Sequence, residues 1–278
     1  MKSVILTGIL AMAAGVACLA GQAPAAKAPA GPQAKSPAEL KAVQAMLGAQ
    51  DPDSMIKTAD DLLTKFADTQ FKDAALAMEA EGYRSKTPPD LDKAQVYADQ
   101  ALAVNPANIQ ANMLMGEILV QTTGTFALDK TEKLAKAEKC LTAALDALKT
   151  TAKPRQQMTD GDWDQFKKDT SATIHNDLGM VASVRRNWDA AATEFKAAIA
   201  DSDQPAFEAR LAATYRQAGK NAEAIAICDK ILADPMGGLP PSAAAQIKSY
   251  VTNLKASAVK ASAAAATPAP APAPAPQK

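Results

Sequence analysis

The sequence is poor in the residues from which most active sites and metal centres are built. Its 278 residues include one histidine, three cysteines and only 4% aromatic side chains. It has no Gly-rich phosphate loop, nucleophile elbow or serine–histidine–carboxylate grouping, and His175 has no HExxH or CxxC partner. Acidic pairs such as Asp60-Asp61 suit a solvated helix face better than paired-carboxylate hydrolysis. We therefore expect no enzyme, no metal and no cofactor.

An excess of charge and a strand-like pattern are also missing. The 30 basic and 30 acidic side chains balance, which removes the electrostatic case for a nucleic-acid partner. No stretch alternates like a β-strand over a useful length. Alanine dominates and glycine is sparse, so intrinsic propensity favours helix. The sequence predicts an all-α protein.

What the sequence does contain is a repeated pair of helical patterns. The stretch Ile174–Leu232 holds one unit written twice, with the small residues Ala191 and Ala224 at equivalent positions 33 residues apart. Three glycines recur at intervals of 34 residues nearer the N-terminus: Gly48, Gly82 and Gly116. Small residues at fixed positions let antiparallel helices approach closely, and larger residues fill the space between repeats.

This pattern resembles the tetratricopeptide repeat (TPR), a helical hairpin of about 34 residues. Tyr215 and the turn at Gly219 also fit its degenerate consensus. The resemblance implies a right-handed α-solenoid of about five TPR hairpins over residues 37–260, closed by a C-terminal capping helix. Extra residues near 121–130 and 149–162 break the period, and we expect loops there before a long helix that starts after Thr159.

The N-terminal segment has the pattern of an export signal. Residues 1–20 combine Lys2 with an apolar run and small residues before Gly21, which predicts a signal peptide cleaved at that point. A retained signal anchor and a lipoprotein acylated on Cys18 stay open as alternatives. We expect an exported protein of the periplasm or cell envelope, with membrane contact only through one of these two alternatives.

Two further segments have too little apolar bulk to fold. Residues 21–36 are rich in alanine, proline and lysine and predict a linker, and residues 261–278 predict a disordered Ala/Pro tail. Cys140 and Cys228 could pair in an oxidising compartment. Cys228 also occupies a packed repeat position, which favours a small core hydrophobe instead.

In TPR proteins the first helix of each hairpin lines a groove that holds a peptide. The resemblance assigns to this groove the residues Glu79, Tyr83, Lys86, Met113, Glu117, Gln121, Asn176, Met180, Ser183, Arg216 and Gln217. They lack the repeated Lys/Asn pattern by which some TPR domains clamp a terminal carboxylate. Methionines mixed with both charge signs suit adaptable protein or peptide binding.

These features predict a protein-interaction scaffold or assembly factor of the cell envelope, with another protein or a peptide as partner. The alternative is a structural spacer or tether that acts through its Ala/Pro-rich ends. An enzyme of unrecognised type is the third hypothesis.

Overall fold

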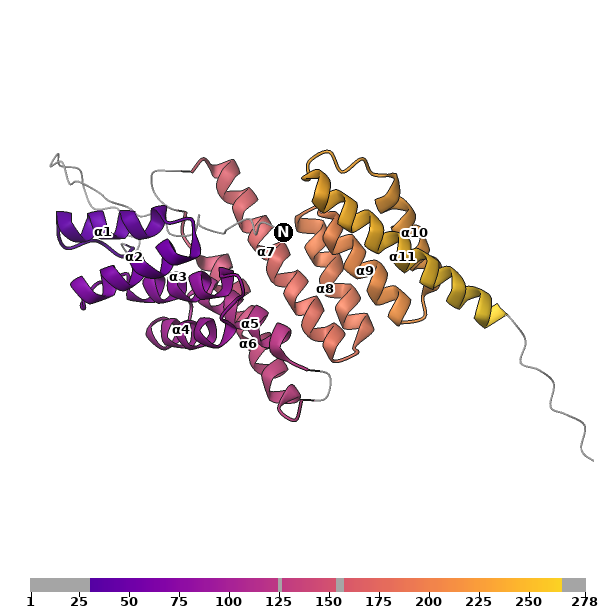
Figure 1. Cartoon of the computed structure of the whole chain (residues 1–278), viewed down its shortest axis with the longest axis horizontal. Coiled ribbons are helices and arrows are strands. Elements are labelled where there is room, and N and C mark those ends of the chain that lie inside the picture. Colours follow the sequence, from indigo (N-terminus) through magenta and orange to yellow (C-terminus); the bar gives the residue numbers. More distant parts are fainter. Residues whose placement is uncertain (1–30, 125–126, 154–157, 267–278) are drawn as a thin grey trace, which may run out of the picture. The chain divides into compact units, whose positions relative to one another are not determined.

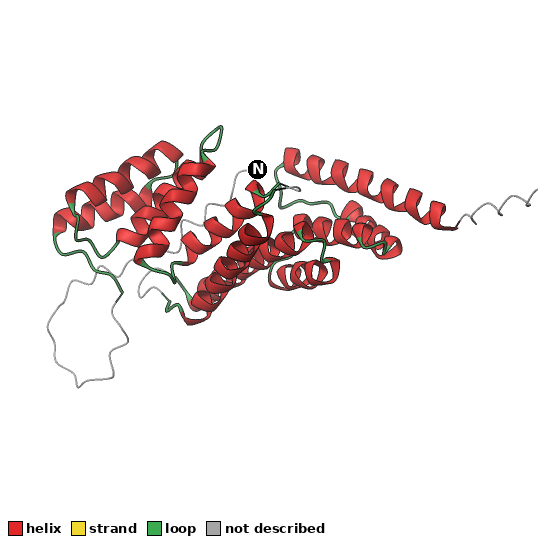
Figure 2. Ribbon diagram, turned by 90° about the horizontal axis from the view of Figure 1, so that it is seen from below, coloured by secondary structure: helices red, strands yellow, loops and turns green. Residues whose placement is uncertain are grey.

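The computed structural model describes residues 31–124, 127–153 and 158–266, which form helices and loops without a β-strand (Figures 1 and 2). The predicted signal segment and most of the predicted linker and tail lie outside the described residues. The helices are, in chain order, α1 (Pro37–Gly48), α2 (Pro52–Lys65), α3 (Lys72–Ser85), α4 (Leu91–Val104), α5 (Ile109–Thr122), α6 (Lys130–Thr150), α7 (Asp160–Val184), α8 (Trp188–Asp201), α9 (Pro205–Gln217), α10 (Asn221–Ala233) and α11 (Pro241–Ala266). The all-α prediction is confirmed.

Local capping residues set the starts of α1 and α7. The Ser36 hydroxyl accepts the backbone N–H of Glu39 at 3.1 Å, and Pro37 is the first residue of α1. At α7 the Thr159 hydroxyl accepts the N–H of Asp162 at 3.1 Å and donates to its carboxylate at 2.7 Å. Each arrangement satisfies N–H groups that have no partner within the first turn of a helix.

Successive helices differ in how much of their surface is covered. α3 is buried without interruption from Ala74 to Gly82, because it packs against α2, α4 and α5. α4 buries only Ala94, Ala98 and Ala101, a single stripe at helical spacing. A stack of helical hairpins produces this alternation, since inner helices are covered on several sides and outer helices on one.

The described residues form two compact units, and the boundary lies inside α7, between Val181 and Ala182. In the first unit consecutive helices pack from α1 to α6, and α3 also contacts α5. In the second unit α8, α9, α10 and α11 pack in order, and α11 also contacts α9. Consecutive hairpin packing is the solenoid arrangement predicted from the sequence. Because each hairpin contacts only its neighbours, such an array has no shared core and can divide.

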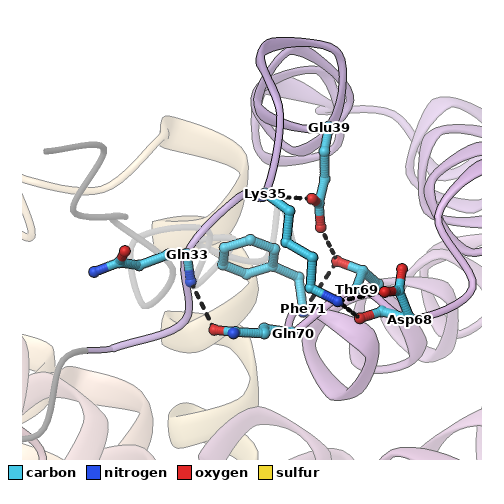
Figure 3. Close-up of polar contacts among 7 residues, drawn as sticks. All are labelled: Gln33, Lys35, Glu39, Asp68, Thr69, Gln70 and Phe71. Atoms are coloured by element: carbon cyan, nitrogen blue, oxygen red, sulfur yellow. Dashed lines mark hydrogen bonds and ion pairs between the residues drawn. The ribbon is translucent and has the colours of Figure 1, made fainter. Parts of the chain in front are cut away.

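The chain ahead of α1 is anchored to the turn between α2 and α3 (Figure 3). Glu39 is buried, and its carboxylate accepts the N–H of Lys35 at 2.6 Å and the hydroxyl of Thr69 at 2.7 Å. The N–H of Gln33 donates to the side-chain oxygen of Gln70 at 3.0 Å. Gln33 and Lys35, which belong to the predicted linker, therefore contact the folded part of the chain.

The other boundaries shift as well. α6 already begins at Lys130, so the loop expected over residues 121–130 covers only the residues after Thr122. α11 continues to Ala266, past the predicted start of the tail at residue 261. Alanine has the highest intrinsic helix propensity, which accounts for this extension of α11 through the alanines near its end.

The three equally spaced glycines make different contacts. A Cβ on Gly82 would lie 2.7 Å from Ile56 Cγ1 of α2, whereas a Cβ on Gly116 would lie 2.5 Å from Leu141 Cγ of α6. A Cβ on Gly48 would meet nothing within 4 Å. Gly82 therefore makes room for the preceding helix, α2, whereas Gly116 makes room for the following helix, α6. The two glycines recur in the same 34-residue period but serve different helix contacts.

Replacing Gly116 by alanine is expected to lower the free energy of unfolding by about 1–3 kcal/mol. Leu141 is fully buried, and three of its side-chain carbons would lie within 3.1 Å of the new methyl group, so packed atoms must shift to admit it. Chemical unfolding of the two proteins measures the difference. Gly48→Ala is the matched control and should be neutral or stabilising by up to about 1 kcal/mol. Equal losses at both positions would contradict the close contact at Gly116.

Candidate functional site

The residues predicted to share one groove lie on two different faces of α3 and its neighbours. Glu79 and Tyr83 lie one turn apart on the face of α3 that contacts α2 and α4, and Lys86, the residue after the end of α3, pairs with Asp53 of α2. Glu117 of α5 instead lies beside Arg84, which belongs to another face of α3. In the first unit these predicted groove residues therefore lie on two faces, and their part in binding stays a prediction.

The face toward α2 and α4 carries a stacked pair of tyrosines. The rings of Tyr83 and Tyr97 lie 5.3 Å apart at an interplanar angle of 11°. The ammonium groups of Lys86 and Lys93 lie 5.6 Å and 5.1 Å from the centre of the Tyr83 ring, within cation–π range. We call these four residues, together with Glu79, the tyrosine cluster.

Both lysines of the tyrosine cluster are also engaged with aspartates. Lys86 pairs with Asp53 of α2 at 3.0 Å, and Lys93 pairs with Asp90, the N-cap residue of its own helix, at 3.6 Å. The pairing raises the pKa of Lys86, chiefly through its hydrogen bond to Asp53. Lys86 therefore stays charged at every physiological pH.

Glu79 is the electrostatic exception in the tyrosine cluster. Its side chain is buried, and among the described residues its Oε2 has no hydrogen-bond partner. Burial, and secondarily the charge of Asp60 on α2, raise the pKa of Glu79 to about 7. Burial and the negative charge of Glu79 also raise the pKa of Tyr97. The site can therefore gain or lose a proton near neutral pH, which an exposed glutamate cannot do.

The face toward α5 holds a second group of polar residues, which we call the arginine cluster. The guanidinium of Arg84 binds both carboxylate oxygens of Glu81, at 2.5 Å and 3.0 Å, and lies 3.5 Å from the carboxylate of Glu117. Ser85 donates to Glu81 at 2.7 Å, and Gln121 donates to Glu117 at 2.8 Å. All of its carboxylates are thus paired, and this cluster is a satisfied network.

Burial opposes the charge of Arg84, but its acidic neighbours outweigh that effect. The hydrogen bond and charge of Glu81, with smaller contributions from Glu117 and from Asp177 of α7, raise the pKa of Arg84. A guanidinium fixed by two hydrogen bonds to one carboxylate is rigid. The arginine cluster links α3 to α5 through the ion pair of Arg84 with Glu117.

The remaining predicted groove residues have varied surroundings. Asn176 is buried, while Met113, Met180 and Ser183 are half-buried. In the second unit Arg216 donates to the Ser257 hydroxyl of α11 at 3.2 Å, and Gln217 is exposed.

Sequence reasoning missed several residues of both clusters: Glu81, Arg84, Lys93 and Tyr97. Tyr97 is one of only four tyrosines, and that rarity is the signal by which it could have been singled out. No signal in the sequence distinguishes Arg84 from the other basic residues on helices, because its ion pair with Glu117 depends on how α5 packs against α3.

The two cysteines of the described residues lie inside the fold. Cys140 and Cys228 are both free and buried, and burial raises the pKa of both thiols. This confirms the interpretation of Cys228 as a small core hydrophobe. Within the described residues no group of three or more His, Cys, Asp or Glu side chains could hold a metal ion. No helix in the described part of the chain has the length and hydrophobicity needed to span a membrane.

No protein-family model and no curated protein sequence matches this chain. Among solved structures it is similar to a thermophilic TPR protein of Thermus thermophilus, with 19% identity and a TM-score of 0.44 over 76% of this chain and 91% of that one. It is also similar to a tetratricopeptide repeat protein of Parabacteroides merdae, with 16% identity and a TM-score of 0.38 over 81% and 90% of the two chains.

The packing of consecutive hairpins defines an all-α repeat protein. The hairpins, with periods of 33 and 34 residues and small residues at the close contacts, support the resemblance to tetratricopeptide repeats.

Proposed function

We propose that this protein is an interaction scaffold that binds a protein or peptide partner, and that it works as a scaffold or assembly factor in the cell envelope. The observation that carries the binding proposal is the tyrosine cluster. It combines a half-buried aromatic pair with two lysines and a buried carboxyl group that lacks a full set of partners. Aromatic side chains contribute a disproportionate share of the free energy of protein interfaces.

Further support comes from what surrounds the tyrosine cluster. Repeat proteins offer extended surfaces that bind other chains, and the regular helices hold the side chains of this cluster in fixed positions. The proposed envelope location is supported by the signal-like pattern of residues 1–20.

Replacing Tyr83 by alanine is expected to weaken capture of the partner at least about tenfold, which corresponds to about 1.4 kcal/mol. The measurement starts with fractionation of cells that make the tagged full-length protein, followed by quantitative capture from the envelope fraction and a titration with the captured partner. Tyr250→Ala is the matched control, because Tyr250 is an exposed tyrosine of α11. Circular dichroism shows whether each variant is folded, and Tyr83→Phe preserves the stacked ring if the alanine variant is not.

Deletion of residues 267–278 addresses the alternative function. If the deletion abolishes capture while the Tyr83→Ala protein binds normally, the protein is a tether that acts through its Ala/Pro-rich end. If the native protein is found in the cytoplasmic fraction, the envelope proposal fails.

A further inference from the structure

Glu79 differs from every other buried acidic side chain in the described residues. Glu39 accepts two hydrogen bonds, Glu81 holds Arg84, and Glu208 pairs with Lys230. Glu79 is only 2% exposed, yet its Oε2 has no partner. Burial of an unsatisfied acceptor costs about 1–3 kcal/mol, and more for a charged group. The unpaired Glu79 carboxyl therefore costs stability, which points to a role in binding and not in folding.

The surroundings of Glu79 favour positive charge. Around the tyrosine pair the acidic residues Asp53, Asp60, Glu79 and Asp90 outnumber the basic residues Lys86 and Lys93. Both lysines already lie within cation–π distance of the Tyr83 ring. Neither supplies the missing partner of Glu79, because Oε2 remains unpaired.

We propose that Glu79 and the Tyr83–Tyr97 pair together bind a basic side chain, an arginine or a lysine, of the partner protein. A guanidinium donates two parallel hydrogen bonds to a carboxylate and stacks on an aromatic face, so arginine fits these groups better than lysine. The excess of acidic groups also steers a basic segment toward the site. This inference rests on the proposed function and specifies the chemistry of the partner.

Entry to the site requires a small rearrangement. Glu79 is covered, so the incoming side chain must displace one that borders it. Lys86, the residue after the end of α3, lies 5.6 Å from the centre of the Tyr83 ring, and its ion pair is with Asp53, whose side chain is 85% exposed. Such exposed ion pairs contribute about 0–1 kcal/mol, so little resists the displacement.

The proposed contact depends on the protonation of Glu79. With a pKa of about 7, this carboxyl is mostly protonated at about pH 6 and mostly ionised at about pH 8.5. The ionisable groups whose charges act on Glu79 or respond to it are Asp60 of α2 and Tyr97 of α4, and Tyr83 and Lys86 complete the cluster around Tyr97. Aspartate, lysine and tyrosine ordinarily titrate well outside this range, so Glu79 is the group whose charge changes. A basic ligand should therefore bind more tightly as the pH rises.

The test is a titration of the full-length protein, followed by NMR, with the acetylated and amidated peptide Gly-Ala-Arg-Ala-Gly. The same peptide with neutral citrulline in place of arginine controls for the peptide backbone. The arginine peptide is expected to bind at least about fivefold more tightly at about pH 8.5 than at about pH 6, and the citrulline peptide should show no such change.

Glu79→Gln should weaken binding of the arginine peptide at the higher pH at least about fivefold and remove the pH dependence. The control Glu132→Gln removes one negative charge from an exposed position of α6 and should leave both unchanged. A Glu79→Gln protein that binds the arginine peptide as tightly as the parent would overturn the proposal. Normal capture of the natural partner by that variant would also overturn it and leave the scaffold function intact.

Discussion

At about pH 8 the Glu79→Gln variant is expected to unfold with a free energy about 3 kcal/mol higher than that of the parent protein. Burial raises the pKa of Glu79 from 4.5 to about 7. Each unit of difference between the folded and unfolded pKa corresponds to about 1.4 kcal/mol. Above pH 7 the parent must hold an unpaired carboxylate in a buried place, and glutamine of nearly the same shape removes that charge.

The sign of the effect follows from proton binding. Between about pH 4.5 and pH 7 the folded protein keeps the Glu79 proton that the unfolded chain releases, so the stability of the parent falls as the pH rises through this window. Below it both states are protonated, and the variant should match the parent. Urea unfolding at about pH 4.5 and about pH 8 measures the two differences.

Glu81→Gln is the contrasting control on the same helix. Glu81 forms two hydrogen bonds with Arg84, so its replacement should lower stability at about pH 8, while Glu79→Gln raises it. A Glu79→Gln protein whose advantage over the parent is the same at both pH values would contradict a raised pKa for this group.

Phe71→Ala is expected to lower the free energy of unfolding of the first unit by about 3–5 kcal/mol. Phe71 is fully buried in a cluster of apolar side chains from α1, α2 and α3 that includes Met46, Met55 and Leu62. Removal of the ring leaves a cavity that these surrounding side chains can fill only in part.

The position of Phe71 links this core to the N-terminal anchor. Its N–H donates to the Thr69 hydroxyl at 3.2 Å, and that hydroxyl donates to the buried carboxylate of Glu39 (Figure 3). Hydrogen exchange should therefore show increased opening of α1, α2 and α3, with little change in α8 to α11. Phe66→Ala serves as the control, because Phe66 is only partly buried and should cost less. Equal losses for the two phenylalanines would contradict the central place of Phe71 in this core.

Much of the architecture was already determined by short-range patterns in the sequence. Helix α7 begins after Thr159, as predicted, and the side chains of Ser36 and Thr159 cap the helices that follow them. Ala191 and Ala224 are fully buried, as their equivalent places in the repeat predicted. Helix propensity, capping and a repeated small residue act over a few turns, so the amino-acid order alone specifies them.

The candidate site, by contrast, depended on contacts between helices. The sequence placed Glu79 on a ligand-facing surface with Glu117, yet Glu79 is buried beside α2 and α4, and Glu117 lies beside Arg84. The rotation of α3 relative to its neighbours decides which side chains meet, and 34-residue spacing does not report it. For the same reason Gly82 of α3 approaches the helix before it, α2, whereas Gly116 of α5 approaches the helix after it, α6. The packing of α2, α3 and α4 excludes water from the Glu79 carboxyl group without giving its Oε2 a hydrogen-bond partner, and only the tertiary structure could show this.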